Sequence, residues 1–579
     1  MLGGLVALLL LIVFGCWLGL RTVEAESGLQ EARDNAQDAK DALLKGDAEG
    51  ATRFAAAAKT HAQEARDATH SIPWTITAAV PWLGSPFKTG RQISDVVLGL
   101  AADVLQPAAS TGVALSPDRL LQGNRVDVQL LREQEPALSA LAMAATRLNG
   151  DATAISEPAY LSVIGDARSQ LQRQTADITT LLENTALAAK VAPAMMGADG
   201  PRTYFMGFQT NAEARGTGGL LGGFGVLRFD KGTATVDDLG PNTELDKPFA
   251  PIDLGPEFAG QYGFTDPFTD FRNSNLSSHF PYAAQIWRSM WAQQSGMTVD
   301  GVIAIDPVAL SYLLAAVGQI TMPDGEIVTA DNVVELTESV AYARFPTDQV
   351  ARKQYLQDIA NEVVHKMTGE KIQSPRQLLD ALGRAVSERR IAVWSAVPAE
   401  QTLLEQTPLA HAIPDDPAPY AEVIVNNLGG NKLDYYLDRH IEYAADGCDG
   451  DTRVSTVTVR LTSTAPKEAL PDYVASPAGV SPLLPVEIPN GTMLTSVKLL
   501  ATSGAKLESV LANGKKVTVF AKVERGHPTF EAQVALPPGQ SGELIFRLSE
   551  PTSPGAPRVP VQPLIDGVTP VVSVPECAK

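Results

Sequence analysis

Cysteine and histidine are scarce in this sequence, and basic residues are fewer than acidic ones. Its 579 residues include 3 cysteines and 7 histidines, and 46 Lys and Arg stand against 66 Asp and Glu, a formal net charge of −20. Such an acidic body repels phosphate backbones, which argues against nucleic acid as a partner. The histidines have no ligand spacing, which argues against a zinc site built from them. An anionic ligand would need a local basic pocket.

Signatures of common catalytic and nucleotide sites are also absent. The sequence has no P-loop and no G-x-S-x-G nucleophile motif. The segment GTGGLLGG at 216–223 lacks the G-x-G-x-x-G spacing and leads into a strand pattern rather than a helix. We therefore reject a dinucleotide site, and any chemistry has to come from polar residues outside these motifs.

Long apolar runs are rare, and the exception lies at the N-terminus. The run from Leu2 to Leu20 has nineteen residues without a charge, which as a helix span about 28 Å, close to a bilayer core. Phe14, two residues before Cys16, argues against a lipoprotein. We predict a transmembrane anchor over residues 1–21. A cleaved signal peptide is the alternative, although no basic start or small-x-small site is clear.

The acidic C-terminal body and the other cysteines indicate the side of the membrane. Arg21 follows the helix and slightly opposes the positive-inside rule. Cys448 and Cys577 both fall in the last, β-rich region and suit a disulfide in an oxidising compartment. Two unpaired buried thiols are the alternative. The prediction is a single-pass protein of the cell membrane, with residues 2–20 in the bilayer and the large domain extracytoplasmic.

The chain is too long for one hydrophobic core and divides by pattern. Alanines and leucines recur at 3-4 spacing over 24–70, with a break at Gly46-Asp47, which predicts an antiparallel helical hairpin. Trp74 and Trp82 follow it, either in the headgroup layer or as caps on the hairpin core. Helical patterns continue, so we expect a helical stalk over 22–190.

Strand patterns begin near residue 195 and define two further domains. Strands mixed with helices predict an α/β domain over 191–428, with a β-hairpin around Asp230-Lys231-Gly232. From about 430 the pattern is nearly all β, and Asn513-Gly514 is a strong hairpin turn. Strands at such short intervals predict an immunoglobulin-like β-sandwich over 429–579.

Three polar clusters lie in the predicted α/β domain. They are QTNAEARGTGG (209–219), expected as a loop after a strand, TDFRNSN (269–275) and YARFPTDQVARKQ (342–354). Each pairs an arginine with a carboxylate or an amide, and the planar guanidinium suits phosphate oxygens. Together they could form a pyrophosphate cradle. Surface salt bridges and turn caps are the alternative explanation.

Four separated segments resemble a known domain of unknown function. They are QTNAEARGTGGLLGGFGVLRFDKG, DFRNSNLSSHFPYAAQIW, VDGVIAIDPVALSYLLAAVGQI and NNLGGNKLDYYL, in order across 190–440. That domain occurs in membrane-anchored envelope proteins of Gram-positive bacteria. It resembles, at a distance, the LytR-CpsA-Psr family, which transfers glycopolymers from polyprenyl pyrophosphate to peptidoglycan.

The resemblance implies roles for particular residues. Arginines would hold the pyrophosphate, helped by neighbouring polar side chains, and the predicted set is Arg215, Arg272, Arg344, Arg352, Lys353, Gln354, Asn211 and Asn275. The chain departs from that family where a magnesium-binding Arg-Ser-Asp is replaced by Thr-Gly-Gly. Asp270 or Glu213 would then supply the missing carboxylate, as catalytic base, and Asp270 also as a ligand of Mg²⁺.

Two functions follow as alternatives. In the first, the protein is a phosphotransferase that moves a glycan phosphate from polyprenyl pyrophosphate to a wall acceptor. In the second, it is a non-catalytic, membrane-anchored binding or scaffold protein of the envelope. Convergence of Arg215, Arg272, Arg344 and Arg352 on one pocket, with an acid nearby, separates them.

Overall fold

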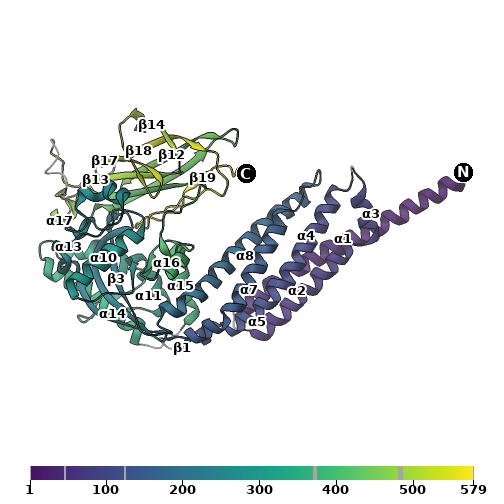
Figure 1. The fold of residues 1–579 in the computed structure, drawn as a ribbon, viewed down its shortest axis with the longest axis horizontal. Coiled ribbons are helices and arrows are strands. Elements are labelled where there is room, and N and C mark those ends of the chain that lie inside the picture. The colour runs from purple at the N-terminus through teal and green to yellow at the C-terminus, as the bar shows by residue number, and fades with distance from the viewer. Residues whose placement is uncertain are drawn as a thin grey trace. The chain divides into compact units, whose positions relative to one another are not determined.

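The protein is multidomain, with a helical part and a part built on mixed sheets. The computed structural model describes residues 2–44, 47–81, 83–122, 125–369, 374–479 and 487–577. Its chain forms two compact units, Met1–Asp199 and Gly200–Lys579 (Figure 1). The boundary expected at 190/191 lies inside the last helix of the first unit, α8 (Ser162–Met195).

The first unit begins with the expected antiparallel hairpin of α1 (Leu2–Leu44) and α2 (Ala48–Thr69). Alanines of the two helices share buried clusters at both ends of the hairpin. One cluster contains Ala39 and Ala55, and the other contains Ala25 and Ala68. Such small side chains let two helix backbones approach closely. The Asp47 side chain accepts a hydrogen bond from the Gly50 N–H and caps α2.

Further helices complete this unit. They are α3 (Ile72–Ala79), α4 (Ser85–Gly99), the π-helical η1 (Leu100–Leu105), α5 (Gln106–Ala114), α6 (Pro117–Leu120), α7 (Val128–Thr153) and α8, with a short hairpin of β1 (Leu121–Gln122) and β2 (Arg125–Val126). Trp74 is buried against Ala25, Ala68 and Phe87, so it caps the hairpin core. Trp82 lies outside the described residues.

Two stretches bear on the membrane prediction. Leu2–Leu20 forms the first part of α1, and from Phe14 to Glu24 no side chain is buried, while the side chains before Phe14 lie outside the description. Within the described part of the chain, one helical stretch, Ser85–Gly112, is long and apolar enough to cross a membrane. Its apolar residues Ile93 and Ala109 pack into the helical core, which also accounts for its composition.

The second unit contains a mixed sheet with strands in the order β5, β4, β3, β6 and β9. Only the β3–β6 pair is parallel among these strands. Their bounds are β3 (Arg202–Arg215), β4 (Gly218–Asp230), β5 (Thr233–Pro241), β6 (Gly301–Ile305) and β9 (Ile391–Ser395). The hairpin predicted at 230–232 is confirmed, because Lys231 and Gly232 adopt positive φ between β4 and β5.

Helices and short turns surround this sheet. They are η2 (Asn242–Leu245), α9 (Pro256–Tyr262), η3 (Gly263–Thr265), η4 (Phe271–Asn273), α10 (Phe280–Ser295), α11 (Pro307–Val317), α12 (Val333–Glu335), the π-helical η5 (Leu336–Val340), α13 (Ala341–Arg344), α14 (Gln349–Gly369), α15 (Pro375–Ser387), α16 (Pro398–Leu404) and η6 (Pro408–Ala410), with a hairpin of β7 (Ile320–Thr321) and β8 (Ile327–Val328). An aromatic core of Phe205, Phe224, Trp287 and Trp291 holds α10 on the sheet.

Two further sheets pack over one core. The described residues form a four-stranded sheet, β10-β13-β17-β16, and a six-stranded sheet, β15-β14-β18-β12-β11-β19. Val423 and Val497 of the first share a buried core with Val459 and Phe546 of the second. The β12 side chains alternate between buried and less buried, as its sequence predicts.

The strand bounds of this part are β10 (Ala421–Asn427), β11 (Leu437–Ala445), β12 (Thr452–Ser463), β13 (Met493–Ala501), β14 (Lys506–Ala512), β15 (Lys515–Lys516), β16 (Phe520–Glu524), β17 (His527–Leu536), β18 (Ser541–Pro551) and β19 (Val571–Ser573), with η7 (Leu433–Tyr436) and α17 (Asp472–Ala475). Strand β10, expected in the α/β domain, pairs with β13 instead. Cys448 and Cys577 are joined by a disulfide, and Cys16 is a free, exposed thiol.

Candidate functional site

A cavity of about 960 Å³ opens between the mixed sheet and the four-stranded sheet, inside the second unit. Its wall includes residues of β3, α9, α14, β10, β13 and β17. Of the predicted site residues, those that line it are Glu213, Arg215, Asp270, Arg272, Arg352 and Lys353. Segments more than a hundred residues apart in sequence therefore meet at one place.

The first polar cluster is a strand and not the expected loop. Strand β3 continues to Arg215 and β4 begins at Gly218, with register shifts on the way. A Cβ on Gly216 would lie 2.4 Å from the Leu276 carbonyl oxygen, and one on Gly219 would lie 2.2 Å from that of Thr210. These glycines allow close approach of the protein's own backbone rather than of a ligand.

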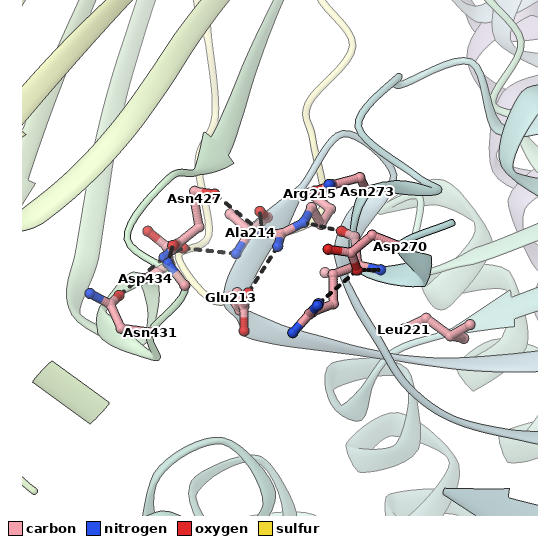
Figure 2. A network of polar contacts seen from close by, with 12 residues as sticks. Glu213, Ala214, Arg215, Leu221, Asp270, Asn273, Asn427, Asn431 and Asp434 are labelled. Atoms are coloured by element: carbon pink, nitrogen blue, oxygen red, sulfur yellow. Dashed lines mark hydrogen bonds and ion pairs between the residues drawn. The ribbon is translucent and has the colours of Figure 1, made fainter. Parts of the chain in front are cut away.

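Glu213 lies at the centre of a buried charge network. Its carboxylate pairs with the Arg215 guanidinium at 2.9 Å and with the Lys432 ammonium. Arg215 also donates to the Arg272 carbonyl oxygen and to the Ala214 carbonyl oxygen (Figure 2). Burial would raise the pKa of Glu213, but Lys432 and Arg215 hold it below its usual value. Glu213 is thus a fixed anion, and it is poorly suited to act as a base.

The loop after β10 fixes the end of β3 from the other side. Asp434 accepts hydrogen bonds from the Ala214 N–H at 2.8 Å and from Asn427 at 2.7 Å. Asn431 in turn accepts from Asn427 at 3.2 Å, and Figure 2 shows these three side chains beside Ala214. Burial raises the pKa of Asp434 to about 6. The loop that carries Lys432 is therefore held tightly against the cavity wall.

Arg272 and Asp270 form a local pair at the cavity. The Asp270 carboxylate accepts from both the Arg272 backbone N–H and its Nε, at 3.0 and 2.7 Å. About half of the Arg272 side chain is exposed. Asp270 is therefore engaged in capping η4 and in binding Arg272.

Arg352 is the cavity arginine with an unused donor. It is 2% exposed, and its guanidinium lies 3.8 Å from the Tyr473 ring centroid. Nη1 donates to the Phe345 carbonyl oxygen at 2.7 Å, whereas Nη2 is buried and has no partner among the described residues. The neighbouring Lys353 donates to Asn242 at 3.0 Å, and burial lowers its pKa.

The other predicted phosphate ligands do not line the cavity. Arg344 forms a two-pronged ion pair with Glu326, at 2.8 and 2.7 Å, on a partly exposed surface. Gln354 is paired with Asp358, while Asn211 and Asn275 are buried and donate to Pro563 and to the β3–β4 turn. Three of the four predicted arginines thus converge, and Arg344 does not.

Two groups that the motifs did not single out face the same cavity. Glu338, on η5, accepts from Thr210 Oγ1 at 2.8 Å and from the Ala212 N–H at 2.7 Å, and burial raises its pKa to about 7. Lys432 lies in NNLGGNKLDYYL, one of the segments that carry the resemblance, but nothing in that segment alone shows that it meets Glu213. Both lie far from β3 in sequence, so spacing carries no signal for them.

The residues present do not fit a magnesium site. Asp270 is bound by Arg272, and Glu213 by Arg215 and Lys432. In the described ranges, no group of three or more His, Cys, Asp or Glu is placed to hold a metal ion. Hard cations need several free oxygen ligands, which these two paired carboxylates do not offer.

Comparisons with known proteins give one family match and little else. Residues 199–342 match the model of a family described as a protein of unknown function, DUF4012. No curated protein matches the chain. Among solved structures, a protein titled as a nutrient-binding protein of Legionella pneumophila matches at 9% identity and a TM-score of 0.14. That match covers 23% of this chain and 44% of the other, and such a low score supports no argument.

Proposed function

We propose that the second unit binds the phosphate-bearing head of a lipid-linked cell-envelope glycan in this cavity. The observation that carries the proposal is the convergence of Arg215, Arg272, Arg352, Lys353 and Lys432 on one cavity, which acidic residues such as Glu213 and Asp270 line as well. Arg352 matters most, because its Nη2 is a buried donor that has no partner in the described part of the chain. Charge-assisted hydrogen bonds to phosphate oxygens are among the strongest that a protein can offer such a group.

The cavity wall also suits the apolar part of a lipid carrier. Leu310 of α11 and Leu356 and Ile359 of α14 line it beside the basic groups. We interpret the mixed-sheet part as a distant LytR-CpsA-Psr relative and the two packed sheets as an immunoglobulin-like sandwich. The stretch of α1 from Phe14 to Glu24 has no buried side chain, which supports anchoring at the membrane. The Cys448–Cys577 disulfide supports an extracytoplasmic position of the second unit.

Binding is favoured over catalysis because the predicted bases are occupied. Glu213 and Asp270 are both bound by cations within the protein. Glu213, whose pKa is held below its usual value, stays ionised and is a weak proton acceptor near neutral pH. The protein is then a receptor or carrier for the glycan, and chemistry needs another group.

Glu338 supports transfer as a second candidate function. It lines the cavity and has a pKa of about 7, which suits a general base. In that reaction an acceptor hydroxyl would attack the glycan-linked phosphorus and pass its proton to Glu338. The bond to the bridging oxygen would break, and polyprenyl phosphate would leave. Glu338→Gln should then abolish release of polyprenyl phosphate while binding remains.

The binding proposal is tested with the full chain in detergent micelles and a short-chain polyprenyl-pyrophosphate glycan. We expect Arg352→Gln to weaken binding about 10- to 100-fold, the loss typical of a charged hydrogen bond. Arg344→Gln is the matched control, eight positions earlier and off the cavity, and should leave affinity unchanged. Equal affinity for the Arg352 variant and the wild-type protein would refute the proposal.

A further inference from the structure

The four-stranded sheet turns a polar face toward the cavity. Asn426 of β10, Ser496 of β13 and Gln533 of β17 lie in one row across the sheet, because Asn426 pairs with Ser496 and Ser496 with Gln533. Lys498 and Glu531 pair in the next row on the same face. All five line the cavity. The opposite face of these strands is the apolar core of the sandwich, so this polar face has to be explained separately.

Two acceptors on this side of the cavity receive no hydrogen bond from the described residues. Gln261 of α9 and Asn426 are 4% and 5% exposed, and neither Gln261 Oε1 nor Asn426 Oδ1 has a hydrogen-bond partner in the described structure. Buried polar atoms are nearly always paired, and an unpaired one destabilises the fold. Phosphate cannot supply the missing donors, because an ionised phosphate only accepts. A ligand that satisfies these atoms has to carry O–H or N–H groups.

Two charged residues nearby add an acceptor, Glu531, and a donor, Lys498. Glu531 accepts from Ser496 at 2.5 Å, and its carboxylate lines the cavity. Lys498 is buried and donates to the Tyr262 hydroxyl at 2.9 Å. Gln533 is exposed, so ligand can reach this row from solvent. Alternating acceptors and donors over two rows of a sheet match the closely spaced hydroxyl groups of a sugar ring.

An aromatic ring stands exposed at the same end of the cavity. Phe264 of η3 lines the cavity and is 77% exposed, with Lys522 Nζ 4.8 Å from its ring centroid. An exposed phenyl ring offers an apolar face, which suits the C–H face of a sugar.

We propose that Gln261, Asn426, Glu531 and Gln533, with Phe264 beside them, form a carbohydrate subsite for the sugar attached to the bound phosphate. This inference rests on the proposed function, because a phosphate bound at Arg352 places its attached sugar beside the sheet. The β-sandwich then has a role in recognition, because its cavity-facing surface binds the sugar while the mixed-sheet part binds the phosphate.

The test compares two probes on the full chain in detergent micelles. One is farnesyl pyrophosphate, which has no sugar, and the other is the same pyrophosphate carrying a disaccharide. The Gln261→Met and Gln533→Met variants remove amide groups while keeping side-chain length. Gln354→Met, an exposed amide off the cavity, is the matched control.

We expect the double variant Gln261→Met, Gln533→Met to bind the glycosylated probe about tenfold more weakly, at two neutral hydrogen bonds lost. Its affinity for farnesyl pyrophosphate should not change. Gln533→Met alone should show a smaller loss of the same kind, and its exposed position keeps the test valid if the buried change disturbs folding.

Four results would overturn the subsite. If the wild-type protein binds both probes with equal affinity, or if the variants weaken both probes alike, the sugar is not read here although the proposed phosphate binding stands. If the wild-type protein binds neither probe, the proposed function fails and the subsite with it. A loss in the Gln354→Met control equal to that of the double variant would also refute it.

Discussion

The alanine seam of α1 and α2 and the cavity of the second unit are both buried, but they are built in opposite ways. At the seam, Ala39, Ala55 and Ala62 are fully buried and present no polar side-chain atom. In the cavity, Glu213 and Lys432 bury opposite charges, and Arg352 keeps a donor that is unpaired among the residues that the structure describes. The seam is complete by itself, whereas the cavity has polar atoms left over for a ligand.

This difference indicates that the seam serves stability alone, whereas the cavity combines stability with binding. A seam of small residues is stabilised by many weak contacts, each of which contributes little. A buried charge network depends on each member, because removal of one partner leaves another charge uncompensated. Substitutions in the two regions should therefore differ in size and in what they disturb.

The largest effect is expected from Glu213→Ala. This change leaves Arg215 and Lys432 as buried cations without their shared anion, which should lower the free energy of unfolding of the second unit by about 3–5 kcal/mol. Urea unfolding followed by hydrogen exchange of the β3 amides measures it. The control is Glu326→Ala, which breaks the more exposed pair with Arg344 and should cost about 1 kcal/mol or less. Similar losses in both variants would contradict the network's role.

The next effect is a pH dependence carried by Glu338. Its folded-state pKa, about 7, is raised from 4.5 by burial, so the native state binds the proton more tightly than the unfolded state does. That contribution to stability is fully present below pH 4.5 and is lost as pH rises toward 7. The loss is about 3 kcal/mol, because a pKa difference of one between the folded and unfolded states corresponds to about 1.36 kcal/mol.

Glu338→Gln, which mimics the protonated carboxyl, should remove this part of the pH dependence. The measurement is urea unfolding of the second unit at pH values from 4.5 to 7.5 for both proteins. The wild-type curve should fall relative to the variant curve as pH rises. Parallel curves would show that Glu338 does not titrate in this range.

The sequence predicts the first unit better than the cavity, for a physical reason. The 3-4 spacing that places Ala51, Ala55 and Ala62 on one helix face is local, so the hairpin can be predicted without knowledge of the rest of the fold. Turn residues are equally local, and Asn513 and Gly514 adopt the positive φ that their hairpin turn requires.

The cavity depends on pairings that no local pattern encodes. Glu213 and Lys432 are 219 residues apart in sequence, and they meet because the β10 loop packs on the end of β3. Arg344 and Arg352 lie in the same predicted cluster, yet only Arg352 reaches the cavity, because Arg344 is bound by Glu326 from the β7–β8 hairpin region. Residue type indicates the chemistry, but the fold decides which residues share a site.

A smaller effect is expected where the seam is overfilled. Ala62→Leu adds bulk where Ala32 and Ala62 meet, and overpacking of this kind should cost about 1–3 kcal/mol in the first unit. Ala56→Leu, on the exposed side of α2, is the control and should be neutral. Hydrogen exchange of the α2 amides in the full chain measures both. An equal effect at the two positions would show that the seam is loosely packed.

The smallest effect is expected at the turn that joins the seam's two helices. Asp47 accepts from the Gly50 N–H at 2.9 Å, and because this contact lies within one helical turn, its loss should be felt only locally. Asp47→Ala should destabilise α2 by about 1 kcal/mol, while Asp47→Asn, which keeps an acceptor, should have little effect. Hydrogen exchange of the first α2 amides in the full chain distinguishes them. A loss from Asp47→Ala as large as that from Glu213→Ala would mean that the first unit also depends on single contacts, and the contrast between seam and cavity would fail.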